Sequence, residues 1–143
     1  MKVITVTRTT TATPEDVWEL FADIPGRPRW DDALESISGS FELGGRGRVK
    51  LKGQPERAWE IIECVHLQRY TDRFFLPLGG RMDWVHRIEA TDDGCEVTFD
   101  ISVGGPTTLI LRPIMRAILS KELPPTVDKL VALAERRMVN PAN

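Results

Sequence analysis

The longest helical pattern in the chain lies at its carboxyl end, and it constrains the possible folds more than any other feature. Between residues 123 and 138, apolar side chains recur every three or four positions: Leu123, Val127, Leu130, Val131, Ala134 and Met138. That spacing places them on one face of a helix. A second, broader apolar face lies upstream and consists of Leu111, Ile114, Met115, Ile118 and Leu119. A helix this apolar needs a large concave partner, and we expect the rest of the chain to form a sheet that supplies it.

Prolines modify this helical pattern. The segment contains Pro106, Pro113, Pro124 and Pro125. An interior proline removes a helical hydrogen bond and bends or breaks the helix. We therefore expect regular helix from about Pro113 to about Met138, with a distortion near residues 123–125.

The amino-terminal residues predict a strand followed directly by a helix. Residues 2–11 are rich in β-branched side chains that alternate between two faces, which is typical of a strand. Thr13 can cap a helix that begins at Pro14, and Asp16 can complete a capping box. This helix would bury Val17, Leu20, Phe21 and Ile24. The sequence Pro-Gly-Arg-Pro at 25–28 ends it, and residues 29–32 predict one more short helix or turn.

The middle of the chain predicts six further strands separated by turn residues. They cover residues 34–40, 47–53, 57–65, 68–76, 81–91 and 95–104. Short strands at this spacing indicate an antiparallel meander. Because two short helices precede them, the α+β class is favoured over an all-β fold.

The last hairpin allows a prediction of register. If Asp93 and Gly94 form a two-residue turn, Ile88 faces Phe99, His86 faces Ile101 and Trp84 faces Val103. One face is then apolar with a single imidazole, and the other face brings Arg87 to Asp100. For residues 68–76 the facing stays open: either Tyr70, Asp72 and Phe74 point inward, or Arg73 and Phe75 do.

Composition excludes several classes of function. The 143 residues suit one domain, 1–143, and 41% hydrophobic with 28% charged residues is typical of a globular protein. A net charge of -2 gives no general attraction to nucleic acid or an anionic membrane. The chain has no run approaching the ~18 apolar residues of a membrane span, and its first residues lack the apolar segment of a signal peptide. We expect a cytoplasmic protein without stable membrane insertion.

The cysteines and histidines do not form a metal-binding pattern. Cys64 and Cys95 have no CxxC spacing, so buried free thiols are expected. Cys64, His66, His86 and Cys95 also lack paired zinc spacing. The sequence therefore predicts no metal and no cofactor.

Three local motifs, in this order of elements, resemble the START-like helix-grip superfamily (SRPBCC, or polyketide cyclase/dehydrase-like). Residues 12–18 read ATPEDVW, similar to its A-x-P-E-x-V-W helix start, and Trp30-Asp31 is similar to its W-[DP]. Residues 123–135 are similar to its L-P-x-x-L-x-x-L-x-x-x-A-E helix. The resemblance implies seven strands curled around the last helix, with an apolar cavity between them. Its members bind lipids, sterols, polyketides, quinones or plant hormones, and a minority are enzymes; no catalytic motif of the superfamily is present here.

The expected cavity gives a set of candidate site residues. Its apolar wall would consist of Trp59, Met82, Trp84, Phe99, Met115, Leu119, Leu123 and Val127. His86 lies among them and is the candidate catalytic residue, as an acid or base. Arg8 could anchor a carboxylate or phosphate from the first strand, or could instead reach out to solvent. The alternative for all of them is ordinary core packing.

Three hypotheses of function follow. The first is binding, for carriage or sensing, of a small hydrophobic molecule such as a lipid, polyketide or quinone, by a monomer or homodimer without nucleic acid. The second is a cyclase, aromatase or dehydratase that uses His86. The third is a protein-interaction module with a collapsed pocket.

Overall fold

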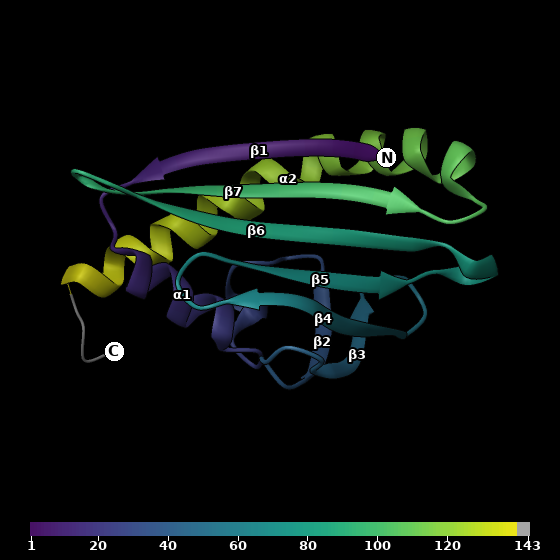
Figure 1. The fold of residues 1–143 in the computed structure, drawn as a ribbon, viewed down its shortest axis with the longest axis horizontal. Coiled ribbons are helices and arrows are strands. Elements are labelled where there is room, and N and C mark those ends of the chain that lie inside the picture. Colours follow the sequence, from purple (N-terminus) through teal and green to yellow (C-terminus); the bar gives the residue numbers. More distant parts are fainter. Residues whose placement is uncertain (140–143) are drawn as a thin grey trace.

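The structure is a computed structural model that describes residues 1–139, which form a curled antiparallel sheet and a long carboxyl-terminal helix (Figure 1). The strands are β1 (Lys2–Thr10), β2 (Leu34–Gly39), β3 (Arg46–Leu51), β4 (Arg57–Val65), β5 (Arg69–Phe75), β6 (Arg81–Thr91) and β7 (Gly94–Gly104). The helices are α1 (Pro14–Ala22), α2 (Thr108–Val139) and the 3-10 turns η1 (Arg27–Arg29) and η2 (Pro77–Gly79). The strand order is β1-β7-β6-β5-β4-β3-β2, so the first strand, β1, pairs with the last strand, β7. This confirms the predicted α+β class and helix-grip architecture.

Helix α1 forms as its sequence predicts. The Thr13 hydroxyl accepts a hydrogen bond from the Asp16 backbone N–H at 3.1 Å, and the Asp16 carboxylate accepts one from the Thr13 N–H. This reciprocal pair satisfies two amide groups that a helix start leaves free. The predicted apolar face is buried: Val17, Leu20, Phe21 and Ile24. The second short helix, expected at 29–32, is η1 and begins two residues earlier.

Helix α2 is longer than its prolines suggested. It begins at Thr108, five residues before the expected start, and Pro113, Pro124 and Pro125 all lie inside it. Figure 1 shows its first half running beside β1 and its second half turning away along the sheet. The predicted stripe is buried at Leu123, Val127, Leu130 and Ala134. The side chain of Met138 lies outside the described residues.

Two arginines attach α2 to the edge strand β1. Arg112 donates from Nε to the Lys2 carbonyl oxygen at 2.7 Å, and Arg116 donates from Nη1 to the Val3 carbonyl oxygen at 3.4 Å. The first half of α2 is therefore fixed to the sheet along one side by charged hydrogen bonds.

The last hairpin has a different register from the predicted one. Thr91 pairs with Gly94, so Asp92 and Asp93 form the turn, and Ile88 faces Val97 while His86 faces Phe99. A Cβ atom on Gly94 would lie 2.1 Å from the carbonyl oxygen of Thr10. The glycine therefore serves the close approach of β1 and not the turn. Because the shift is two residues, the predicted inward and outward faces are unchanged.

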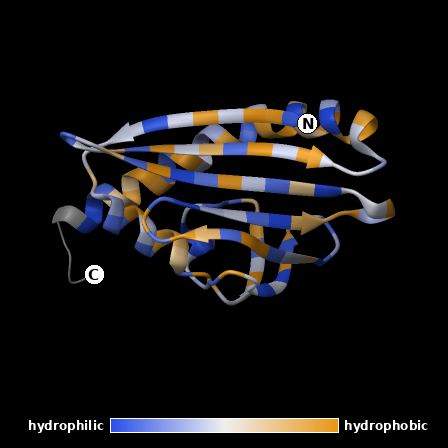
Figure 2. Cartoon of the chain, in the orientation of Figure 1, coloured by the Kyte–Doolittle hydropathy of each residue, from blue (hydrophilic) through white to orange (hydrophobic). Residues whose placement is uncertain are grey.

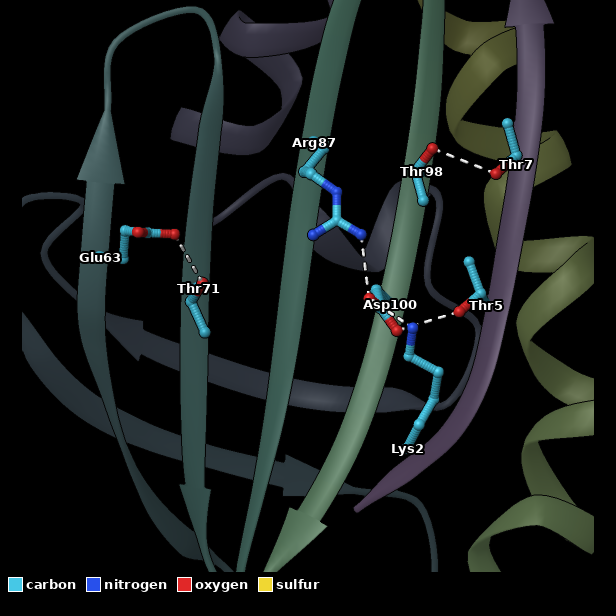
Figure 3. Close-up of polar contacts among 8 residues, drawn as sticks. All are labelled: Lys2, Thr5, Thr7, Glu63, Thr71, Arg87, Thr98 and Asp100. Atoms are coloured by element: carbon cyan, nitrogen blue, oxygen red, sulfur yellow. Dashed lines mark hydrogen bonds and ion pairs between the residues drawn. The ribbon is translucent and has the colours of Figure 1, made fainter.

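The outer face of the sheet is polar, as Figure 3 shows. Asp100 accepts hydrogen bonds from Arg87 at 2.9 Å and from Thr5 at 3.0 Å, and Lys2 lies 3.4 Å away. The predicted Arg87–Asp100 contact is present, on a diagonal of the ladder. The alternation of hydropathy along β6 and β7 (Figure 2) separates this face from the buried one.

Candidate ligand-binding cavity

A cavity of about 290 Å³ lies between the inner face of the sheet, the β2–β3 hairpin and the first half of α2. Most of its wall is apolar, and β2 and β3 contribute Leu34, Ile37, Val49 and Leu51. The rim includes Ile114 and Ile118 of α2, which line the cavity and are also exposed to solvent. The cavity therefore has a mostly apolar wall, and part of its rim is apolar as well.

Most of the candidate site residues lie in this wall. The lining includes Met82, Trp84, His86, Phe99, Met115, Leu119 and Leu123. They come from β6, β7 and α2. The inward-facing positions of the strands and the apolar face of the helix both face the cavity. The sequence pattern thus placed these side chains on the correct faces.

Three of the candidate residues do not line this cavity, contrary to the prediction: Arg8, Trp59 and Val127. Arg8 donates from Nε to Asp128 of α2 at 2.7 Å and is 39% exposed, because β1 is an edge strand far from the β2–β3 hairpin. Trp59 is buried under β2 and donates from its indole nitrogen to the Ser38 carbonyl oxygen at 3.0 Å. Val127 is packed completely in the core beyond the cavity.

The facing of β5, left open by the sequence, places a carboxylate in the interior. Tyr70, Asp72 and Phe74 face inward and pair with His86, Trp84 and Met82 of β6, respectively. Arg73 points to the outer face, where it binds Asp83 through two hydrogen bonds of 2.8 and 2.9 Å.

Asp72 forms a buried ion pair with Arg27 of η1. The Arg27 Nη1 and Asp72 Oδ2 atoms are 3.0 Å apart, and the two residues are 4% and 2% exposed. Arg27 also donates to the Phe21 carbonyl oxygen at 3.2 Å and lies over the rings of Tyr70 and Trp59. Burial raises the pKa of Asp72, and the nearby Arg27 charge opposes that shift. Removing only one partner of such a pair would destabilise the fold, because it would leave an isolated buried charge.

Asp31 contributes a second carboxylate to the cavity lining. Its Oδ1 atom accepts a hydrogen bond from the Ala33 N–H at 3.1 Å. Burial raises the pKa of Asp31 to about 6. A carboxyl group with this pKa exchanges a proton close to neutral pH, as general acids and bases do.

His86 is part of an aromatic stack. Its ring lies 4.0 Å from the Tyr70 ring and parallel to it, and 4.5 Å from the Phe99 ring at a steep angle. Its Nδ1 atom is 3.4 Å from the Tyr70 carbonyl oxygen. Burial, with a smaller effect of Arg27, lowers the pKa of His86 well below its usual value. The imidazole is therefore neutral at pH 7, and its role in ligand binding or proton transfer stays a prediction.

Comparisons with known proteins agree with this geometry. Residues 1–135 match the family described as polyketide cyclase / dehydrase and lipid transport. The chain belongs to this family. No protein with a curated description matches the sequence.

Solved structures share the fold of this polyketide cyclase/dehydrase and lipid transport chain at low sequence identity. Protein MLL2253 from Mesorhizobium loti has a TM-score of 0.77 and 15% identity, over 93% of this chain and 96% of that one. Protein CV1439 from Chromobacterium violaceum has a TM-score of 0.69 and 21% identity, over 92% and 96%. DynU16, a protein of the dynemicin biosynthetic locus, has a TM-score of 0.69 and 18% identity, over 92% of this chain and 46% of its own. Family and cavity together support hydrophobic-ligand binding in general.

Among the polar residues of this family member's cavity, the sequence marks His86 but does not mark Arg27 or Asp31 as cavity residues. In the sequence Arg27 belongs to a helix-breaking segment, and Asp31 belongs to the Trp30-Asp31 motif. The alternation of residues 70–74 offered a signal for Asp72, but the parity of the 77–80 loop was unknown. No local signal marks Arg27, since its partner lies 45 positions away in the sequence.

Residues 1–139 contain no group of three or more His, Cys, Asp or Glu side chains placed to hold a metal ion. Within the same range, no helix is long and apolar enough to cross a bilayer. Cys64 and Cys95 are free thiols.

Proposed function

We propose that this protein binds one small hydrophobic molecule in the cavity, as a carrier or a sensor. The apolar cavity supports this proposal most directly. Burial of apolar ligand surface against Met82, Phe99 and Leu119 would supply most of the binding free energy, at about 25 cal/mol per Å².

The size of the cavity favours a small ligand. Its 290 Å³ is at the lower end of the roughly 300–1,000 Å³ common for small-molecule sites. A compact ring system such as a quinone or polyketide fragment suits this volume better than a lipid with two acyl chains. An open volume of this size also argues against an interaction module with a collapsed pocket.

Binding can be tested with a neutral apolar fluorescent probe, N-phenyl-1-naphthylamine. We expect saturable binding of one probe per chain and its loss in Met115→Trp, because the larger side chain fills the cavity. Leu109→Trp is the matched control, since Leu109 lies on the same helix, is exposed and does not line the cavity. Equal probe binding by both variants would contradict the proposal. If the probe binds as expected, native mass spectrometry of protein purified from its own host would identify a co-purified ligand.

An enzyme of the cyclase or dehydratase type is the second candidate, and Asp31 is the observation that favours it. Asp31 lines the cavity and its pKa of about 6 suits proton exchange near neutrality. His86 could act as a neutral base, but its stacking on Tyr70 leaves little room to reorient. Turnover of a hydrophobic carbonyl substrate that is lost in Asp31→Asn would support this candidate.

A further inference from the structure

The cavity lining contains a compact polar cluster, defined here as Arg27, Trp30, Asp72 and Trp84. Arg27 lies in η1, and Trp30 directly follows that turn. The backbone N–H of Trp30 donates a hydrogen bond to the Arg27 carbonyl oxygen at 3.1 Å. Asp72 and Trp84 are paired neighbours on β5 and β6. The Arg27–Asp72 ion pair joins the two halves of the cluster.

Each member of the polar cluster has a buried side-chain atom without a hydrogen-bond partner in residues 1–139. These atoms are Arg27 Nε, Trp30 Nε1, Asp72 Oδ1 and Trp84 Nε1. Arg27, Trp30 and Asp72 are themselves more than nine-tenths buried. Buried donors and acceptors in folded proteins are nearly always paired, because an unpaired one costs free energy. These four atoms have almost no accessible surface, so their side chains must turn toward the cavity to meet an occupant. Since all four residues line the cavity, we expect their missing partners on an occupant that these side chains turn to meet.

The chemistry of these atoms specifies the complementary group. Three of them are N–H donors and one is a carboxylate acceptor. A carbonyl oxygen can accept two of the N–H bonds. A hydroxyl group can accept from Arg27 and donate to Asp72. Oxygen on an otherwise apolar molecule therefore satisfies the cluster.

The charges around the cavity disfavour an ionised ligand. The Arg27 guanidinium is already paired with Asp72. Besides the neutral His86, the other ionisable lining residues are Asp31, Glu122 and Arg57, so two cations face three anions. A carboxylate would lose its hydration on entry and would gain no net attraction in return.

We propose that the polar cluster selects ligands that carry a neutral carbonyl or hydroxyl oxygen over carboxylates of the same shape. This inference rests on the proposed function, because it names the ligand class of the same cavity. It favours quinone-like or polyketide-like molecules and disfavours fatty acids.

The test compares three probes of one shape by titration calorimetry at pH 7: 2-naphthol, 2-methylnaphthalene and 2-naphthoate. We expect 2-naphthol to bind at least tenfold more tightly than either of the others. The double variant Arg27→Met/Asp72→Leu removes both charges together, which avoids an unpaired buried charge. It is expected to abolish the preference for 2-naphthol and to keep binding of 2-methylnaphthalene. Thermal unfolding followed by circular dichroism reports whether each variant is folded.

The matched control is Arg73→Met/Asp83→Leu. It removes an ion pair between β5 and β6 on the outer face, where neither residue lines the cavity. This variant is expected to keep the full preference for 2-naphthol.

The possible outcomes separate this inference from the proposed function. Equal affinities for all three probes would overturn the inference and support apolar binding. Tightest binding of 2-naphthoate would show an anion site and overturn it as well. No binding of any probe would overturn both. If the double variant does not fold, the ranking of probes by the unmodified protein still decides.

Discussion

The two halves of α2 have similar apolar content and opposite surroundings. In the second half, Val127, Leu130 and Ala134 are 0% exposed and pack against the sheet and α1. In the first half, Leu109 and Ile110 are 81% and 67% exposed, and neighbouring residues line the cavity. Figure 2 shows apolar positions along both halves. The same residue types thus stabilise the fold at one end of the helix and enclose a binding volume at the other.

The buried ionisable groups follow the same division. Arg27, Asp72 and His86 are buried and line the cavity, whereas the packed end is held by apolar contacts and by peripheral ion pairs such as Arg137–Glu19. We therefore expect the packed end to determine stability and the cavity end to determine its dependence on pH.

The largest effect is expected from Leu130→Ala at the packed end. Deleting a fully buried leucine side chain removes its contacts and leaves a void, which should lower the free energy of unfolding by about 2–5 kcal/mol. Urea denaturation measures this change. Leu109→Ala, on the exposed side of the first half, is the control and should change stability by less than about 0.5 kcal/mol. Similar losses in the two variants would contradict the division.

Asp31→Asn should stabilise the protein above pH 6. The folded-state pKa of Asp31 is about 6, above its unfolded value, so the wild-type fold loses stability as the pH rises from about 4 to 6 and this partly buried group ionises. Asparagine can still accept the Ala33 N–H bond but carries no charge. We expect a gain of about 1–2 kcal/mol at pH 8 and almost none at pH 4, measured by denaturation at both pH values. A gain that is equal at both would refute this origin.

His86→Phe should act in the opposite pH range. Because burial keeps the His86 imidazole neutral in the folded state, the wild-type fold loses stability as the pH falls below the unfolded pKa of about 6.5. Phenylalanine can keep the stacking on Tyr70 without this cost. The stability of the variant relative to the wild type should improve between pH 8 and pH 5, because only the wild type has this cost. A difference that is independent of pH would indicate that His86 is solvated.

The smallest effect on stability is expected from Ile114→Ala at the cavity rim. Ile114 is about half exposed, so its truncation should change the free energy of unfolding by no more than about 0.5 kcal/mol. Since it lines the cavity, the same truncation should weaken binding of N-phenyl-1-naphthylamine several-fold. Unchanged probe affinity would place the entrance elsewhere.

Local patterns predicted the parts of this fold that depend on local interactions. The capping box at Thr13, the face of α1, and the stripe from Leu123 to Ala134 each follow from residues within a few turns of one another. The inward faces of β6 and β7 follow from alternation in the same way, and they supply Met82, Trp84 and Phe99 of the cavity wall.

The features that sequence did not predict depend on distant partners. Gly94 looks like a turn residue, yet its position is set by the backbone of Thr10. Arg8 pairs with Asp128, 120 positions away, instead of entering the cavity. Arg27 is buried against Asp72 of β5, 45 positions away in the sequence. Long-range charge pairing leaves no periodic signal, so the polar cluster emerged only from the folded chain.

The arginine contacts between α2 and β1 also protect the margin of the sheet. An outermost strand presents free backbone carbonyls that a foreign strand can use to extend the sheet, which leads to aggregation. Arg112 and Arg116 occupy two such carbonyls on β1, at Lys2 and Val3. The helix that roofs the cavity therefore also shields this strand from edge-to-edge association.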